Sequence, residues 1–293
     1  MAQDHHAPQL AFIGFGEAAE AFATGWGHER TAAAAAFDVK GTDAAGLPRQ
    51  RAERMGVGLA VDRAEALRGA GAVFCLVTAD RAVAAAEECA GLLPSGCFWL
   101  DGNSCSPGAK RRAAQAIADA GGRYVDVAIM APVHPKLHRT PLLIAGPHAQ
   151  EAAPLLASLD MAFEIAGDRV GDASAIKMIR SVMIKGMEAL TAECLLAARR
   201  AGVDGRILSS LQASNPGIDW PGQAAYNLER MMVHGRRRAA EMREVAATLD
   251  ELDLPSALAQ ATADWQQRIG DLELPGVRDD FASRADAILR RLD

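Results

Sequence analysis

The stretch QLAFIGFGEAA, residues 9–19, decides the fold of the N-terminal half. An apolar run ends at a glycine, and residues 14–19 read G-x-G-x-x-A, a form of the strand–turn–helix that binds dinucleotides. In such a turn the first glycine permits the bend, the second lets the backbone approach a pyrophosphate, and Ala19 keeps the helix close to the strand. The helix then directs its N–H groups and positive dipole end at the phosphates. The cofactor-binding residues predicted from this pattern are Gly14, Phe15, Gly16, Glu17 and Ala18.

A dinucleotide site also needs an acidic residue at the end of the second strand, where it takes the ribose hydroxyls. Asp43 follows Ala19 by 24 residues, close to the usual spacing of about 20. A carboxylate there repels a 2′-phosphate and favours NAD. Arg49 and Arg51 lie just beyond and are able to pair with such a phosphate, so NADP stays open. Methyltransferases also carry a glycine-rich first turn, but their glycines usually fall as GxGxG, and residue 18 is alanine.

Outward from this turn, short apolar runs alternate with helical stretches as far as residue 167. The runs predicted as strands are 9–15, 37–43, 58–62, 72–78, 97–103, 123–130, 141–146 and 162–167. Strands that alternate with helices form a parallel sheet covered on both faces. Near-continuous apolar runs such as AVFCLV, residues 72–77, are typical of strands buried on both sides. The fold class predicted is therefore α/β, with a Rossmann-type, doubly wound, mostly parallel sheet in the N-terminal domain.

Beyond residue 167 the strand pattern stops, and an all-α domain is predicted. Residues 171–201 form one long helical stretch closed by Gly202. The loop 214–222, SNPGIDWPG, is the clearest break among the helices that follow. We therefore divide the chain into a nucleotide-binding domain, 1–168, and a helical domain for substrate binding and dimerisation, 169–293.

The long helix carries the second chemical signal. At about 100° per residue, apolar side chains such as Met178, Val182 and Met183 fill one broad face. A narrow polar stripe opposite contains Lys177, Ser181, Lys185 and Glu188, with Arg180 at its edge. Such a stripe is often only a solvated helix face. However, ligands bind outside the carboxyl ends of the strands, near the start of this helix. A lysine there is able to exchange the hydroxyl proton during hydride transfer if partial burial lowers its pKa.

Together, the glycine turn, DGNSCSP (101–107), YVDVAIM (124–130) and GDASAIK (171–177) resemble the β-hydroxyacid dehydrogenase superfamily. The C-terminal half resembles a bacterial subgroup with a 6-phosphogluconate-dehydrogenase-like domain and no assigned substrate. The resemblance implies that Lys177 is the catalytic lysine and that Asn103, Ser104 and Ser181 lie beside the substrate, with Arg180 nearby. It also implies that Thr78 lines the cofactor.

One motif departs from the superfamily pattern. The superfamily reads D-A-P-V-S-G-G, and its serine and glycines hold the substrate carboxylate. This chain has Met130 at the serine position, counted from Asp126, and a thioether cannot donate a hydrogen bond. We therefore expect a more apolar substrate pocket. His134 and Lys136, just beyond Met130, are candidates for the polar groups that replace the serine.

The resemblance implies reversible hydride transfer between a nicotinamide cofactor, NAD or NADP, and an alcohol/carbonyl pair of a small molecule. Imine reduction and phosphogluconate-type oxidative decarboxylation are alternatives on the same scaffold. A non-catalytic nucleotide-binding module is a further alternative. Relatives also dimerise through the helical domain, which predicts a homodimer. The basic cluster 236–238 is either a solvated helix face or an anion-binding site.

Composition narrows the remaining classes. The net charge is −6, which argues against nucleic acid as a partner. No apolar run approaches the ~18 residues that a membrane span needs. The five cysteines contain no CxxC pair, which predicts a reducing cytoplasm without a disulfide framework. No cluster of histidines or carboxylates predicts a metal site.

Overall fold

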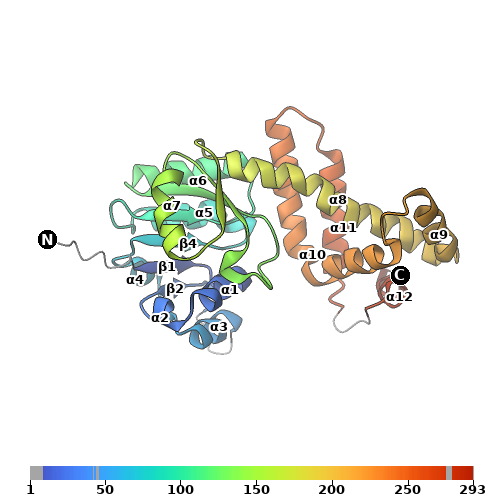
Figure 1. Ribbon diagram of the computed structural model, residues 1–293, viewed down its shortest axis with the longest axis horizontal. Coiled ribbons are helices and arrows are strands. Elements are labelled where there is room, and N and C mark those ends of the chain that lie inside the picture. Colours follow the sequence, from blue (N-terminus) through green and yellow to red (C-terminus); the bar gives the residue numbers. More distant parts are fainter. Residues whose placement is uncertain (1–8, 42, 44–45, 275–278, 293) are drawn as a thin grey trace. The chain divides into compact units, whose positions relative to one another are not determined.

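The computed structural model describes residues 9–41, 43, 46–274 and 279–292. The chain divides into two compact units, Met1–Lys177 and Met178–Asp293 (Figure 1). The first unit contains an eight-stranded sheet in the order β3-β2-β1-β4-β5-β6-β7-β8. All neighbouring strands are parallel except β6 and β7. The strands are β1 Leu10–Ile13, β2 Ala35–Phe37, β3 Gly58–Leu59, β4 Ala72–Cys75, β5 Phe98–Asp101, β6 Arg123–Ile129, β7 Leu142–Ala145 and β8 Phe163–Gly167.

Helices cover both faces of this sheet because its strands are apolar on both sides. In β1, Phe12 packs in a cluster with α1, α3 and α7, whereas Ile13 packs in the opposite cluster with α4, α5 and α6. The helices of this unit are α1 Glu17–Trp26, α2 His28–Thr31, α3 Leu47–Met55, α4 Arg63–Leu67, α5 Ala82–Ala90, α6 Pro107–Asp119 and α7 Ala149–Ser158, with short 3-10 turns η1 Ala79–Arg81 and η2 Leu137–Arg139.

The described residues of the second unit form helices joined by loops. The helix α8, Asp172–Arg200, begins in the first unit and continues into the second. It is followed by α9 Asp204–Ser214, α10 Trp220–Glu251, α11 Ala257–Gly270 and α12 Phe281–Leu292. Gly235 of α10 and Gly270 of α11 allow a close crossing, because a Cβ on either would lie under 3 Å from the backbone of the other helix. None of the helices described in either unit is long and apolar enough to cross a membrane.

The predicted fold class is confirmed: a mostly parallel, Rossmann-type sheet precedes an all-α region. One strand was misplaced. The run 37–43 was expected as the second strand, but β2 consists of Ala35–Phe37. Its first two residues end the alanine run, which has low β-propensity, and β2 pairs with β1 on one side and β3 on the other.

Candidate functional site

The glycine turn after β1 lies at the point where the chain order of the sheet reverses. β1 pairs with β2 on one side and with β4 on the other. Gly14 has φ +86°, and a Cβ there would lie 2.5 Å from the carbonyl oxygen of Leu76. Its N–H donates to the Phe37 carbonyl at 2.8 Å. Only glycine is therefore tolerated at position 14, because the turn passes directly between the ends of two neighbouring strands.

The second glycine of the turn has a different environment. A Cβ on Gly16 would meet no described atom within 4 Å. Gly16 is also the N-cap of α1, and none of the described side chains caps that helix end. The first N–H groups of α1 therefore border open space, which is the arrangement that accepts a pyrophosphate. These observations show that a dinucleotide fits the residues present, although Glu17 places a carboxylate in the same first turn.

Asp38 is the acidic residue at the carboxyl end of β2. Its Oδ2 accepts the N–H of Phe15 at 2.9 Å, and its Oδ1 accepts the N–H of Lys40 at 2.8 Å. The expectation that Asp43 ends this strand is wrong, since β2 stops at Phe37 and Asp43 lies in the exposed segment beyond it. Asp38 directly follows the apolar residues of β2. The predicted strand, 37–43, instead places Asp38 near its start.

The two arginines proposed for a 2′-phosphate differ in their contacts. Arg51 forms an ion pair with Glu20 of α1 at 2.8 Å. Arg49 donates to the Gly41 carbonyl at 3.1 Å, while its buried Nε has no hydrogen-bond partner among the described residues. Neither contact involves Asp38, whose carboxylate bonds directly to the turn backbone at Phe15.

Other predicted residues follow the carboxyl ends of neighbouring strands, at the same edge of the sheet as the glycine turn. Thr78 follows β4 and is exposed, Asn103 and Ser104 follow β5, and Met130 follows β6. Asn103 is buried, whereas Ser104 and Met130 are half-buried. The parallel strands β1, β4, β5 and β6 thus place at one edge of the sheet four loops that are far apart in the sequence. Ligand sites in such sheets are built from loops at this edge.

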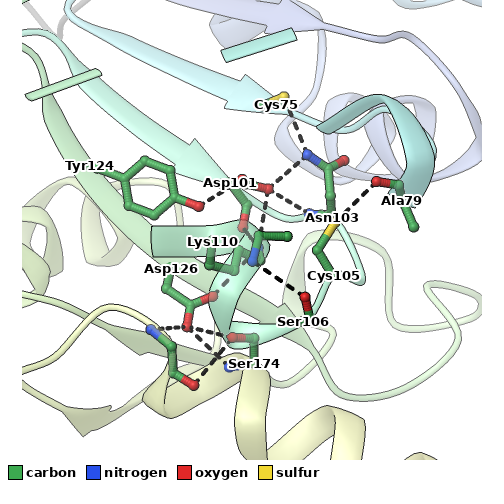
Figure 2. A network of polar contacts seen from close by, with 12 residues as sticks. Cys75, Ala79, Asp101, Asn103, Cys105, Ser106, Lys110, Tyr124, Asp126 and Ser174 are labelled. Carbon is green, nitrogen blue, oxygen red and sulfur yellow. Dashed lines mark hydrogen bonds and ion pairs between the residues drawn. The ribbon is translucent and has the colours of Figure 1, made fainter. Parts of the chain in front are cut away.

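The Asn103 amide is held in one orientation (Figure 2). Its Nδ2 donates to Asp101 Oδ1 at 2.7 Å and lies 3.3 Å from the Cys75 sulfur. Its Oδ1 is buried and has no hydrogen-bond partner among the described residues. Because both amide hydrogens face these acceptors, Asn103 presents only an oxygen, and a ligand group bound there must donate a hydrogen bond.

A buried lysine that the sequence analysis missed lies beneath this loop. Lys110 of α6 is completely buried, and its Nζ lies 2.6 Å from the carbonyl oxygen of Asp101 and 3.1 Å from its Oδ1. Asp126 Oδ1 lies 3.4 Å from the same Nζ (Figure 2). Burial alone would lower the pKa of Lys110, but the charges of Asp101 and Asp126 outweigh it and raise that pKa. The ammonium is therefore a permanent structural charge.

Two further buried groups border the network. Tyr124 donates its hydroxyl to Asp101 Oδ2 at 2.7 Å, and burial followed by the Asp101 charge raises the pKa of Tyr124 well above its usual value. Burial also raises the pKa of the Cys75 thiol, with a further contribution from Asp101. Cys75 is therefore an acceptor for Asn103 rather than a nucleophile.

Met130 belongs to an apolar cluster at the end of β6. The cluster contains the buried side chains of Ala128, Ala145 and Ala173, and Met130 packs against it. Ala173 lies in the first turn of α8 and takes the place of the second glycine in the superfamily's lysine motif. Two departures from the superfamily pattern therefore contribute to one apolar contact.

The residues predicted on α8 lie in unlike environments. Lys177 is half-buried and Arg180 is exposed, whereas Ser181 is buried and accepts a hydrogen bond from Lys185 Nζ at 3.0 Å. Within the second unit, Lys185 also pairs with Glu241 at 3.0 Å. A solvated polar stripe is therefore wrong for residues 181–188, where the charges are buried and paired with α10.

The apolar face of α8 is divided. Met178 is buried and Val182 packs partly against the same core, as the helical periodicity predicts. Six other large apolar side chains between residues 172 and 190 are exposed: Ile176, Ile179, Met183, Ile184, Met187 and Leu190. Periodicity located the stripes correctly but could not decide which of them faces the domain core.

The basic cluster 236–238 is paired within the helical unit. Arg236 contacts Asp271 and Glu273, and Arg237 contacts Glu241. Arg238 forms a two-pronged ion pair with Glu188. The hypothesis that this cluster captures an anion therefore has no support in its geometry, because each guanidinium already has a carboxylate.

Comparisons with known proteins cover nearly the whole chain. A conserved hypothetical protein from Sinorhizobium meliloti 1021 is 38% identical, with 98% of this chain and 97% of that chain covered and a TM-score of 0.73. The conserved protein MTH1747, described as having unknown function and structural similarity with 3-hydroxyacid dehydrogenases, is 30% identical. That match covers 90% of this chain and 97% of the other, with a TM-score of 0.66.

More distant structures share the fold. A 3-hydroxyisobutyrate dehydrogenase from Mycobacterium tuberculosis, solved with L-serine, is 14% identical over 97% of this chain and 99% of its own, with a TM-score of 0.71. An imine reductase variant from Myxococcus stipitatus, solved with NAD⁺, is 19% identical over 98% and 100%, with a TM-score of 0.57.

A family model described as a domain of unknown function, DUF1932, matches residues 198–269. This domain is the C-terminal domain of the proteins that resemble 3-hydroxyacid dehydrogenases. Two relatives at 30% identity or more extend over almost all of the sheet and the helical unit. The chain therefore belongs to the family of 3-hydroxyacid dehydrogenase-like proteins.

Proposed function

We propose that this protein is an NAD(P)-dependent oxidoreductase that transfers hydride reversibly between nicotinamide and an alcohol/carbonyl pair. The glycine turn carries the proposal: Gly14 forms the tight turn after β1, while Gly16 and the uncapped start of α1 border open space. A bound nicotinamide would supply the hydride acceptor or donor. Gly14, Phe15, Gly16 and Ala18 would hold the pyrophosphate, with Thr78 lining the cofactor, and Asp38 would meet the adenine ribose.

Lys177 is the acid/base group of this proposal. A hydroxyl must lose its proton as the carbon loses hydride, and a lysine amine accepts that proton when deprotonated. In the reductive direction its ammonium polarises the carbonyl and returns the proton. The position of Lys177 in the superfamily's lysine motif supports this role, as does its half-buried environment.

NAD is the favoured cofactor. The Asp38 carboxylate lies beside the turn backbone and would repel a 2′-phosphate, while its oxygens suit ribose hydroxyls. The ion pair between Arg51 and Glu20 also supports NAD, because it already neutralises one of the two arginines that NADP would need.

The substrate pocket combines an acceptor with apolar surface. Asn103 presents an oxygen, and Met130 replaces the serine that binds a carboxylate in the superfamily. This favours a small substrate with a hydroxyl or amine donor and an apolar substituent over a small hydroxyacid. Ser104 would lie beside such a substrate. Imine reduction is the second candidate, because an imine or amine substrate has no need of a carboxylate site.

We further propose that the protein works as a homodimer in a reducing cytoplasm. The exposed apolar face of α8 suits a second copy of this chain, since contiguous apolar surface on a helix is costly in water. None of the five cysteines forms a disulfide, which is in keeping with a reducing compartment.

The decisive experiment titrates NADH and NADPH by fluorescence and then measures turnover with a panel of aldehydes, ketones and cyclic imines. Lys177→Ala should bind the dinucleotide as the wild type does but lose about 10²–10⁴-fold in turnover. Arg112→Ala is the matched control, because Arg112 is an exposed cation of the same unit that has no place in the proposed site. Tight dinucleotide binding with unchanged turnover in Lys177→Ala would remove Lys177 from the reaction.

A further inference from the structure

The start of α8 is held by a carboxylate from a distant strand. Gly171 precedes the first residue of the helix and has no side chain with which to cap it. Asp126 of β6 takes that place: its Oδ2 accepts the N–H of Gly171 at 3.1 Å and the N–H of Ser174 at 3.0 Å. The Ser174 hydroxyl lies 3.1 Å from the same oxygen. A carboxylate is well suited to this position because the start of a helix is electropositive.

The negative charge of Asp126 is neutralised by a buried lysine. The other oxygen of Asp126 faces the Lys110 ammonium, which also contacts Asp101. All three side chains are completely buried. In a medium of low polarity, separating such charges has a high free-energy cost. The three side chains therefore hold one another in fixed positions.

The far end of the network reaches the substrate loop. Asp101 Oδ1 accepts both the backbone N–H of Asn103, at 3.0 Å, and its side-chain amide. A continuous chain of buried contacts therefore runs from Asn103 through Asp101, Lys110 and Asp126 to Ser174 (Figure 2). Every member belongs to the first compact unit.

Lys177 follows Ser174 by three residues in the same helix and is the last residue of the same unit. Residues three apart on a helix lie on one side, one turn from each other. The position of the first turn of α8 therefore sets the starting point of the Lys177 side chain.

We infer that Asp126, Lys110 and Asp101 form a positioning network that sets the Lys177 amine relative to the Asn103 amide. The inference rests on the proposed role of Lys177 as the acid/base group. Ser174 transmits the position of Asp126 to the helix, and none of the three buried charged groups exchanges a proton with substrate. In this network the start of α8 is capped by Asp126 of the sheet rather than by a neighbouring residue of the chain. The same sheet carries the glycine turn.

The test uses lysine labelled with ¹³C at Cε, because the chain contains only five lysines: Lys40, Lys110, Lys136, Lys177 and Lys185. Each signal is assigned by a Lys→Arg variant. Ser174→Ala removes one hydroxyl from the network and should shift the Lys177 signal while leaving those of Lys40 and Lys136 in place. With a substrate found in the panel, it should also lower kcat by about tenfold or more without weakening dinucleotide binding.

Thr31→Val is the matched control. Thr31 is a buried hydroxyl of the same unit that donates to the Met55 carbonyl at 2.8 Å, outside the network. It should lower thermal stability about as much as Ser174→Ala and leave the Lys177 signal unchanged. An unmoved Lys177 signal in Ser174→Ala, or an equal shift in Thr31→Val, overturns the inference. Full turnover in Lys177→Ala would instead remove Lys177 from the proposed reaction, and the spectra would still decide whether Ser174 positions the lysine.

Discussion

Asp101 and Asp126 are register partners on the neighbouring parallel strands β5 and β6, and both carboxylates face the single ammonium of Lys110. Two carboxylates side by side in a buried sheet repel each other unless a cation lies between them. Lys110 supplies that cation from α6, with the start of α8 as a second positive end at Asp126. The stability of the sheet and the placement of α8 therefore depend on the same charge.

Removal of the central cation should be severe. Lys110→Met should lower the free energy of unfolding by about 3–5 kcal/mol, because it leaves two buried carboxylates without their counter-charge. Asp126→Asn should cost less, and the double variant less than the sum of the two, since the asparagine removes one of the stranded charges. Urea unfolding of the four proteins measures the coupling, and strict additivity would contradict the shared-charge description.

The two glycines of the turn should fail in different ways. Gly14→Ala should destabilise the fold by more than about 1 kcal/mol, because φ is positive and the new methyl meets the Leu76 carbonyl. Gly16→Ala should leave the melting temperature unchanged but weaken NADH binding about tenfold or more, because its methyl projects into the open space beside α1. Thermal melts and fluorescence titrations separate the two effects. Normal NADH binding by a folded Gly16→Ala protein would move the cofactor elsewhere.

Cofactor preference should depend on Asp38. Asp38→Ser removes the charge that faces a 2′-phosphate, and the affinity ratio of NADPH to NADH should rise about tenfold or more. Asp43→Asn is the control, because Asp43 lies beyond the end of β2 in an exposed segment. Equilibrium titrations with both nucleotides supply the ratio. If Asp43→Asn changes it and Asp38→Ser does not, the ribose lies farther along the chain than we propose.

Self-association should depend on the exposed face of α8. Met183→Glu places a charge on a side chain that is 65% exposed in the single chain, and it should convert a dimer to a monomer. Val61→Glu, at a position 79% exposed in the sheet unit, should leave the dimer intact. Size-exclusion chromatography with light scattering reads out the mass. A monomeric wild type, or a Met183→Glu dimer of unchanged affinity, would refute the dimer proposal.

Alkaline pH should weaken the fold through its buried thiols. Burial raises the pKa of Cys97 from 9.0 to about 11, with a smaller opposing effect from Arg123. Above pH 9 the unfolded chain releases this proton while the folded chain keeps it, so the unfolded state binds fewer protons and stability falls as the pH rises towards about 11. Urea unfolding across this range should show a shallower decline for Cys97→Ala than for the wild type. Parallel declines would mean that Cys97 is not responsible.

Much of the fold could be predicted from the sequence, because the patterns that indicate strands, helices and the glycine turn each lie within a short segment. The alternation of apolar runs with helical stretches predicts all eight strands, although the run at 37–43 lies too late by several residues. Gly14 and Gly16 predict the dinucleotide turn because their spacing follows from the geometry of one tight bend. The lysine motif places Lys177 at the start of α8 for the same reason.

Contacts between segments far apart in the chain decided the rest. Whether Asp38 or Asp43 meets the turn depends on where β2 ends, and neighbouring strands determine that end. The burial of Lys185 and Glu188 follows from the packing of α8 against α10, which helical periodicity does not contain. No sequence pattern identified Lys110. Its role depends on Asp101 and Asp126, which lie on two strands that only the folded sheet brings into register. The sequence alone determined the alternation of strands with helices and the nucleotide turn, since both follow from residues within short segments. Only the tertiary structure decided which charges are buried together, because a buried charge is tolerated only where distant partners neutralise it.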